Sequence, residues 1–292
     1  MEGSVQNTTQ RVAAIHGLAG FGRASLTIVI PTLSSLGIQV CPLPTAILST
    51  HTGFTGPSFL DLTDEMERIV AHWKSVGVTF NAIYSGFLGS PKQIGVVSRF
   101  ISDFRSDRQL VVVDPVLADD GKLYRTMGQE MVEGMRTLVA KADLVTPNLT
   151  ELAFLVGEPY SETTALEEIK RWMRRLADNG PKYIVVTSVP VHETGQSSVI
   201  GLDAQGNRFW RVKNERIPVH YPGTGDTFTS VLLGSMMRGE SFPAALDRAV
   251  QFVSLAIRWS FGFDHERREG VALESVLHTL RQDALSYTYE SL

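Results

Sequence analysis

Short apolar runs alternate with amphipathic segments along almost the whole chain. Apolar runs of strand length followed by segments of helix length are typical of βαβ units, and such units build parallel sheets. The pattern therefore predicts an α/β fold with a central, mostly parallel β-sheet that carries helices on both faces. The predicted strands are residues 12–15, 38–41, 46–49, 79–83, 110–113, 144–145 and 183–187. The predicted helices are residues 23–36, 61–75, 91–104, 128–139, 149–156, 165–178, 225–238, 242–260 and 270–281.

One stretch, residues 197–212, breaks this alternation. Two runs of alternating polar and apolar residues flank a Gly- and Asn-containing segment there, which favours an antiparallel hairpin. We expect this hairpin at one edge of the sheet. No repeat, low-complexity tract or linker follows, so we expect a single domain over residues 11–292 after a disordered tail, residues 1–10.

The composition narrows the classes of function. The chain has 27 basic and 31 acidic residues, a net charge of -4, and no basic stripe, so nucleic-acid binding is not favoured. No apolar run approaches the roughly 18 residues of a membrane helix, and the first ten residues lack the pattern of a signal peptide. Cys41 is the single cysteine, which excludes an intrachain disulfide and fits a reducing compartment. We expect a cytoplasmic protein without a nucleic-acid or membrane partner.

A glycine-rich stretch, residues 17–26, follows the first predicted strand. Gly20 and Gly22 approach the dinucleotide-binding fingerprint, but Ser25 stands where that fingerprint has a glycine or alanine. The fingerprint also needs an acidic residue about 20 positions later, and no Asp or Glu lies between residues 11 and 60. Nicotinamide binding is therefore only a minor alternative. Another is that the glycines simply let the loop pack closely under the sheet.

His51 and Thr52 directly follow a predicted strand. Loops at the carboxyl ends of parallel strands line the ligand crevice, so both side chains could hydrogen-bond a bound ring, although a plain turn is the ordinary explanation. The seven histidines show no paired ligand spacing, which disfavours a zinc site.

Acidic residues recur at successive predicted strand ends. Asp114 follows a buried strand, Asp119 lies in the next loop, and Asn148 and Glu151 stand around the start of a helix. Carboxylates that face one crevice could hold Mg²⁺ and so position phosphates. A turn at Asp114 and a capping box of Asn148 with Glu151 explain each residue without a ligand. Their recurrence favours the metal and phosphate interpretation.

The sequence GTGD, residues 223–226, precedes a predicted buried helix. The free amides and the positive dipole end of such a helix form an anion site, and Gly223 and Gly225 remove Cβ atoms that would keep a phosphate away. Asp226 could then accept the proton of an attacking alcohol, as a weak base whose ionised form the helix start favours. An ordinary helix cap is the alternative. The sequence has neither a P-loop nor the protein-kinase signatures.

Taken together, these residues resemble the pyridoxal/pyridoxamine kinase branch of the ribokinase-like superfamily, whose near relatives include the hydroxymethylpyrimidine kinases. The likeness extends over nearly the whole chain after about residue 11. It rests on the segments HGLAGFGRASL, LPTAILSTHTGF, VVVDPVLADDGKLY, ADLVTPNLTEL, VVTS and PGTGDTF, which occur in family order. The resemblance implies a ribokinase-like fold, phosphorylation of the 5'-hydroxymethyl group of a B6 vitamer by ATP, Mg²⁺ and often K⁺ as cofactors, and a homodimer.

The resemblance also implies roles for individual residues. Asp226 would be the base, with Gly223, Thr224 and Gly225 as the hole for the γ-phosphate. The residues implied near ATP are Asp114, Asn148, Thr187 and Ser188, and those implied near the metal are Asp114, Asp119 and Glu151. The residues implied around the vitamer are Gly17, His51, Thr52, Phe87, Tyr124 and Asp226.

Position 17 departs from the family, which usually has serine or aspartate there, and Ala19 replaces a common serine. Gly17 offers no side chain to the polar edge of a ring, and a lost hydrogen bond to a ligand costs about 0.5–1.5 kcal/mol. Two alternatives to a B6 kinase therefore stay open. They are a hydroxymethylpyrimidine kinase of thiamine synthesis and a ligand-binding member of the fold without turnover.

Overall fold

The computed structural model describes residues 9–191, 196–214, 217, 219–262, 266–282 and 287–292. Most of the predicted N-terminal tail, residues 1–8, lies outside the described residues. Ten strands of the described chain form one sheet in the order β12-β11-β10-β9-β8-β5-β4-β1-β2-β3. Their bounds are β1 Arg11–Ala19, β2 Gln39–Leu48, β3 Phe59–Asp61, β4 Ala82–Ser85, β5 Leu110–Val113, β8 Leu144–Val145, β9 Tyr183–Val191, β10 Gln196–Asp203, β11 Arg208–Asn214 and β12 Glu290–Ser291.

The strand directions confirm the predicted sheet. Neighbours from β2 through β1, β4, β5 and β8 to β9 are all parallel. The hairpin of β10 and β11 lies at one edge as predicted, and only the two-residue β12 pairs beyond it. At the other edge β3 is antiparallel to β2. A separate small hairpin joins β6 Ala118–Asp119 to β7 Lys122–Leu123.

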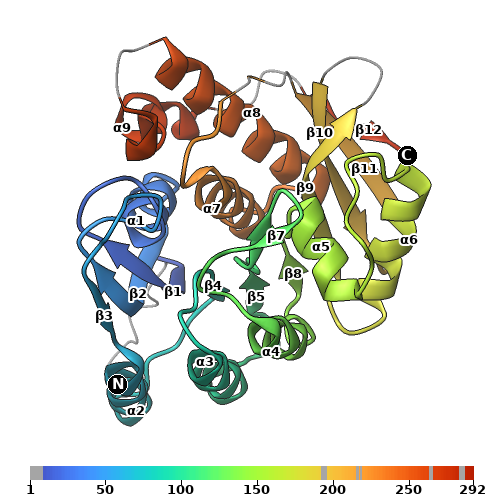
Figure 1. The fold of residues 1–292 in the computed structure, drawn as a ribbon. Helices are drawn as coiled ribbons and strands as arrows, with labels where there is room; N and C mark the ends of the chain where they lie inside the picture. Colours follow the sequence, from blue (N-terminus) through green and yellow to red (C-terminus); the bar gives the residue numbers. More distant parts are fainter. Residues whose placement is uncertain (1–8, 192–195, 215–216, 218, 263–265, 283–286) are drawn as a thin grey trace, which may run out of the picture.

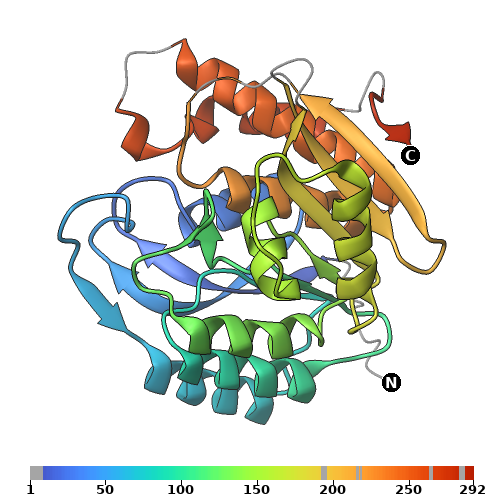
Figure 2. The same cartoon turned by 45° about the vertical axis from the view of Figure 1, so that its right-hand side comes forward.

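Helices cover both faces of the sheet (Figures 1 and 2). One face carries α2 Thr63–Ser75, α3 Pro91–Phe104, α4 Gln129–Val139, α5 Leu149–Val156 and α6 Leu166–Ala177. The other carries α1 Leu26–Ser35, α7 Thr224–Met237, α8 Phe242–Phe261 and α9 Leu273–Val276. The 3₁₀ turns η1 Arg267–Glu269 and η2 Leu277–Arg281 flank α9.

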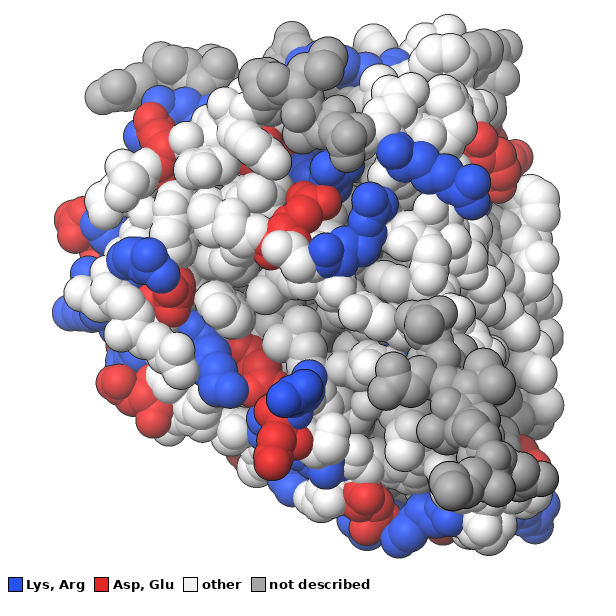
Figure 3. Space-filling model, turned by 180° about the vertical axis from the view of Figure 1, so that it is seen from behind, with Lys and Arg blue, Asp and Glu red and all other residues white. Residues whose placement is uncertain are grey.

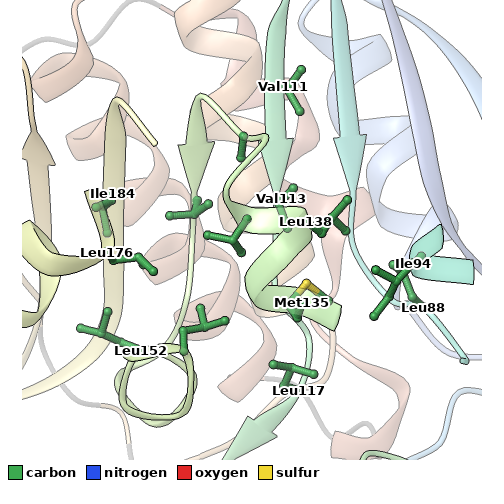
Figure 4. Packing of buried hydrophobic residues seen from close by; sticks show 14 of the residues in the cluster. Leu88, Ile94, Val111, Val113, Leu117, Met135, Leu138, Leu152, Leu176 and Ile184 are labelled. Carbon is green, nitrogen blue, oxygen red and sulfur yellow. The ribbon is translucent and has the colours of Figure 1, made fainter. Parts of the chain in front are cut away.

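Strand β5 shows how the sheet divides the core. Val111 and Val113 pack into the cluster on the α4 side, which includes Met135 and Leu138 (Figure 4), whereas Val112 belongs to the opposite cluster. Successive side chains of a strand point to opposite faces, so a strand buried on both faces is apolar throughout. This is why a continuous apolar run predicted β5 with its correct bounds.

Two predicted strands, residues 38–41 and 46–49, are in fact the single strand β2. Pro42 and Pro44 lie in the part of β2 between the two predicted strands, and proline lacks the amide that a sheet ladder uses. Gln39 donates its amide to Gln10 on the β1 side, so alternation turns Pro42 and Pro44 away from β1. Strand β3 pairs with β2 only at residues 46–48, so no neighbouring strand needs those missing amides.

The helix predicted over residues 270–281 is only partly correct, because the helical part begins at Leu273 and is divided between α9 and η2. Gly270 adopts φ 86 after η1, and a Cβ there would lie 2.8 Å from the Arg23 carbonyl oxygen and 3.1 Å from that of Pro222. This close approach enforces a turn, and only the short α9 and η2 follow. Helix α1 also begins later than predicted, because Ser25 has φ 55. The sequence did not reveal β3, β6, β7 or β12.

On the face seen in Figure 3, basic and acidic side chains are intermingled. None of the helices in the described part of the chain combines the length and apolar character that crossing a bilayer requires.

Candidate active site

The start of α7 lies at the centre of the candidate site. Gly223 precedes the helix in the left-handed conformation, with φ 79, and no side chain caps the first-turn amides. A Cβ on Gly223 would lie 2.4 Å from the backbone oxygen of Arg23, so glycine is required there. The helix begins at Thr224, one residue before the prediction. Uncapped amides and the positive dipole end together suit an anion.

Asp226 lies in the first turn of α7, with a side chain that is 13% exposed. Its Oδ2 accepts a hydrogen bond of 2.8 Å from the amide of Ser25. Burial raises the pKa of Asp226 to about 6, although the Ser25 amide acts in the opposite direction. Burial therefore acts against the ionised form that the helix start was expected to favour.

Ser25 adopts a strained backbone conformation while its amide points toward Asp226. Its φ of 55 and ψ of -127 lie in a region that L residues rarely adopt. Strain of this kind is typically about 1–3 kcal/mol and is frequent at functional sites. The glycine-rich loop thus contributes the strained Ser25 amide to the Asp226 carboxylate. The sequence had suggested only an incomplete dinucleotide-binding fingerprint in this loop.

Asp114 faces the same helix start. A Cβ built on Gly225 would lie 3.9 Å from Asp114 Oδ2. Burial raises the pKa of Asp114 well above its usual range, and the charges of Glu151 and Asp226 raise it further. The structure therefore brings Asp114 close enough to both Glu151 and Asp226 for their charges to repel its own.

Glu151 is fully engaged by backbone amides. Its Oε1 accepts from Leu117 and Ala118 at 3.0 and 3.4 Å, and its Oε2 accepts from Asn148 at 2.9 Å. Burial raises the pKa of Glu151 to about 8 despite these hydrogen bonds. Glu151 thus anchors the loop after β5 to the start of α5, and neither oxygen is bare.

Asp119 and Tyr124 lie in and after the β6–β7 hairpin. Asp119 Oδ1 accepts from the Asp120 amide at 3.0 Å, and burial raises the pKa of Asp119. Tyr124 is 40% exposed, and its pKa is raised by burial and by the charges of Glu151, Asp119, Asp114 and Asp226, in that order. Tyr124 therefore shares the neighbourhood of every acidic residue of the site. Among the described residues, no group of three or more His, Cys, Asp or Glu could hold a metal ion unaided.

Asn148 caps α5 in the capping box that the sequence allowed. Its Oδ1 accepts from the Glu151 amide at 2.8 Å, and its Nδ2 donates to the Ala118 carbonyl at 2.8 Å. It also bridges to Thr187 in parallel fashion. Thr187 and Ser188 lie inside β9 and not at its end. The pairing with β10 shifts register at this point, and Ser188 has φ 58. Such irregularities are common beside active sites.

The space beside Gly17 is apolar. A Cβ on Gly17 would contact Leu48 at 3.5 Å, Phe87 at 3.6 Å and the Thr45 hydroxyl at 3.9 Å, all ordinary distances. Gly17 and Phe87 are therefore brought together as predicted. The Thr45 hydroxyl already donates to the Phe87 carbonyl at 3.1 Å.

His51 is buried and its ring nitrogens are both engaged within the protein. Its Nδ1 accepts from the Gly53 amide at 3.1 Å, which leaves Nε2–H to donate to the Arg268 carbonyl at 2.6 Å. The ring also contacts Phe54 edge-on, at 4.9 Å between centroids. His51 thus connects the loop after β2 to η1, and neither nitrogen is left over for a ligand. Thr52, next to it, is exposed.

Sequence reasoning missed His16. It stands in β1 directly before Gly17, is fully buried, and its Nδ1 lies 3.7 Å from Asp226 Oδ1. Burial lowers the pKa of His16 to about 3, so the ring is neutral. A titratable residue inside an otherwise apolar strand was the available signal.

Comparisons with known proteins find kinases that are similar to this chain. The family model of phosphomethylpyrimidine kinases matches residues 30–270. The pyridoxine/pyridoxal/pyridoxamine kinase of Bordetella avium is 28% identical over 259 residues, which cover 84% of each chain. A candidate phosphomethylpyrimidine kinase from Bacteroides thetaiotaomicron, in a crystal form with pyridoxal, is 54% identical with a TM-score of 0.95 and covers 97% of this chain and 100% of its own. The pyridoxal kinase of Lactobacillus plantarum is 32% identical with a TM-score of 0.83, covering 93% of this chain and 96% of its own.

Proposed function

The chain belongs to the phosphomethylpyrimidine kinase family, and on this premise we propose that it transfers the γ-phosphoryl group of ATP to the 5'-hydroxymethyl group of pyridoxal, pyridoxamine or pyridoxine. The product would be pyridoxal 5'-phosphate or its congener. The resemblance to the pyridoxal kinase branch of the ribokinase-like superfamily is confirmed by the family match and by the related kinases.

One observation carries the proposal: Asp226 lies beside the uncapped amides at the start of α7, with Asp114 facing the same turn. Phosphoryl transfer through a loose transition state depends mainly on positioning and on stabilising the charge of the phosphate. Asp226 accepts the proton of the attacking hydroxyl in this scheme. Gly223, Thr224 and Gly225 receive the γ-phosphate on their backbone amides.

The pKa of Asp226 suits a general base. A group with a pKa near the working pH combines an available ionised form with useful basicity. A value of about 6 leaves Asp226 mostly ionised at pH 7 and makes it a better base than an ordinary aspartate. The weakness expected from the helix dipole alone therefore does not limit the reaction.

The choice of vitamer is supported by the related protein from Bacteroides thetaiotaomicron, which is 54% identical and whose structure was solved with pyridoxal. Gly17, Phe87, His51, Thr52 and Tyr124 are proposed to surround the ring. Gly17 and Phe87 border one apolar space, and His51 holds the loop that carries Thr52.

A kinase of this family uses ATP with a divalent cation, and the acidic residues fit Mg²⁺. Asp114 and Asp119 offer hard oxygen atoms, whereas both oxygens of Glu151 already accept amides. Mg²⁺ in kinases keeps several waters and binds one or two carboxylates together with phosphate oxygens. We assign this contact to Asp114 and Asp119. Glu151 would support it indirectly, by holding the backbone of Leu117, Ala118 and Asn148. The cation would neutralise the phosphate tail.

We propose that the nucleotide lies beside Asn148, Thr187 and Ser188. The Asn148 side chain already bonds the backbone of Ala118 and Glu151, so its part is to hold these segments in place. On the resemblance alone, we also propose a dependence on K⁺, a homodimer and a cytoplasmic location.

The second candidate is hydroxymethylpyrimidine kinase. The family model and the related protein from Bacteroides thetaiotaomicron both bear the phosphomethylpyrimidine kinase name. The two reactions share a ring-borne hydroxymethyl acceptor, so the site chemistry is common to both. The third candidate is a binding protein without turnover, which the missing side chain at Gly17 suggests. The intact residues at the start of α7 argue against it.

One assay separates these candidates. Release of ADP is measured with Mg-ATP and each of pyridoxal, pyridoxamine, pyridoxine and hydroxymethylpyrimidine. We expect turnover with at least one B6 vitamer at a kcat/KM well above that for the pyrimidine. Turnover with the pyrimidine alone would transfer the assignment to thiamine synthesis, and binding without any turnover would identify a binding protein.

A further inference from the structure

His16 lies in β1 with its ring buried against neighbouring residues. Its side chain is 0% exposed and contacts Tyr84 edge-on, at 4.3 Å between ring centroids. A Cβ on Gly86 would lie 2.4 Å from ring atoms of His16, so glycine at that position makes the room. Strand β1, strand β4 and the residue after β4 thus fix the imidazole from three sides.

Neither ring nitrogen of His16 has a hydrogen-bond partner among the described residues. A buried polar group left unpaired typically costs about 1–3 kcal/mol, and an apolar side chain would avoid that cost. A histidine kept under these conditions needs a reason beyond packing. A neighbouring carboxyl group gives one, because Asp226 Oδ1 lies 3.7 Å from His16 Nδ1.

The two oxygens of Asp226 therefore differ. Oδ2 accepts from the Ser25 amide at 2.8 Å, and Oδ1 faces the imidazole at a distance slightly beyond a hydrogen bond. Contacts of this kind in free enzymes are often long and tighten in the complex with substrate. A carboxylate oxygen has two lone pairs, so Oδ1 can accept from one donor and still receive a proton.

Burial lowers the pKa of His16, so a neutral imidazole faces Asp226. The other groups near Asp226 are the Ser25 amide, which donates to Oδ2, and Asp114, Tyr84 and Tyr124, whose pKa values the Asp226 charge raises. None of these is a cation, so a neutral N–H from His16 would be the donor available to Oδ1 from β1.

We propose that His16 is a positioning residue, which donates Nδ1–H to one lone pair of Asp226 Oδ1 and so holds the other lone pair toward the substrate hydroxyl. This inference rests on the proposed function and assigns to β1 a part in the reaction. Ser25 and His16 would then fix the carboxylate from two sides, at Oδ2 and Oδ1.

The test compares His16→Asn with His16→Leu. The two side chains have the same branching, but only asparagine places an N–H donor where Nδ1 lies. We expect His16→Leu to lower kcat about tenfold or more with KM for both substrates within about twofold, because the contact acts in the transition state. His16→Asn should recover kcat to within about threefold of the natural protein.

A matched control lies on the same helix as Asp226. Ser235 is also buried with an unpartnered hydroxyl among the described residues, and it is nine positions further along α7, about 13 Å away. Ser235→Ala should leave kcat unchanged. Melting temperatures of all variants show whether they fold.

Equal kcat for folded His16→Leu and His16→Asn variants would overturn the inference, whether both match the natural protein or both fall. An increase of KM with unchanged kcat in His16→Leu would also overturn it. Failure of the proposed function is distinct, because the natural protein itself would then show no turnover with any B6 vitamer.

Discussion

Asp226 shows that burial changes the chemistry of a group that the sequence places at a helix start. The sequence suggested an ionised, weak base, since a carboxylate at a helix start is stabilised by the dipole. In the structure, burial raises its pKa to about 6. A residue pattern reveals which groups adjoin a helix end, but the loss of solvent around them depends on segments far apart in sequence.

The raised pKa makes a prediction about stability. The folded chain binds the Asp226 proton more tightly than the unfolded chain, whose value is near 3.8, so stability falls as pH rises from about 4 to about 6. Above that range the ionised carboxyl costs about 3 kcal/mol. Asp226→Asn should therefore be more stable than the natural protein by about 2–3 kcal/mol at pH 8 and by about half as much at pH 5, measured by urea unfolding.

Asp143→Asn is the control for this experiment. Asp143 is also buried but pairs with Arg105 at 2.9 Å and Lys182 at 3.2 Å, so its replacement should destabilise the protein. If Asp226→Asn were less stable than the natural protein at pH 8, the burial argument would be wrong.

Gly17 gives a second prediction at this scale. A Cβ there meets only ordinary contacts, so Gly17→Ser should fold with a stability within about 0.5 kcal/mol of the natural protein. The new hydroxyl would border the apolar space beside Phe87. We expect KM for pyridoxal to fall about 2- to 12-fold, the equivalent of a hydrogen bond of 0.5–1.5 kcal/mol. An unchanged KM for every vitamer would show that position 17 does not contact the ring.

Sequence reasoning located most acidic residues of the site but not their hydrogen bonds. Glu151 and Asn148 were expected near metal and nucleotide, and their alternative as a capping box was also stated. The structure contains that capping box, and it adds bonds from Leu117 and Ala118 that come from a loop about 30 residues earlier. Long-range bonds of this kind leave no local pattern.

At the scale of elements, local signals succeeded where caps were strong. Helix α3 was predicted with its correct bounds, and in the structure the Ser90 side chain caps it and Pro91 begins it. Helix α5 likewise begins after its capping box and ends at Gly157 with φ 73. The helix predicted over residues 270–281 starts later than expected, because close packing against Arg23 and Pro222, and not a local signal, turns the chain at Gly270.

The turn before α7 can be tested in the same terms. Gly223→Ala would put a methyl group 2.4 Å from the Arg23 carbonyl oxygen, in addition to the strain of φ 79. Gly37 has a similar φ of 83 but nothing within 4 Å of its Cβ position, so Gly37→Ala isolates the strain. We expect about 1–2 kcal/mol of destabilisation for Gly37→Ala and about 1–3 kcal/mol more for Gly223→Ala, measured by denaturation.

The same pair reports on function. Gly223→Ala should lower kcat by tenfold or more, because its helix start moves the phosphate-binding amides, whereas Gly37→Ala should leave kcat unchanged. Equal kcat in the two variants would mean that the start of α7 takes no part in the reaction.

At the scale of the whole molecule, four distant segments meet at the site. The loop after β1 bonds η1 through the Arg23 amide and the Glu269 carbonyl at 2.8 Å. The loop after β2 reaches the same turn through His51 and the Arg268 carbonyl. Gly270 and Gly223 both enclose the Arg23 carbonyl, which joins α7 to the group. A parallel sheet creates this meeting point, because its strand ends and helix starts gather at one edge.

The most direct test of the central claim is the fate of the γ-phosphate in the presence of pyridoxal, followed by phosphorus NMR for the natural protein and for Asp226→Asn. Both proteins should bind ATP with similar affinity. The natural protein should yield pyridoxal 5'-phosphate, and Asp226→Asn should form it about 10²- to 10⁴-fold more slowly. Formation of the product at equal rates by the two proteins would contradict the account.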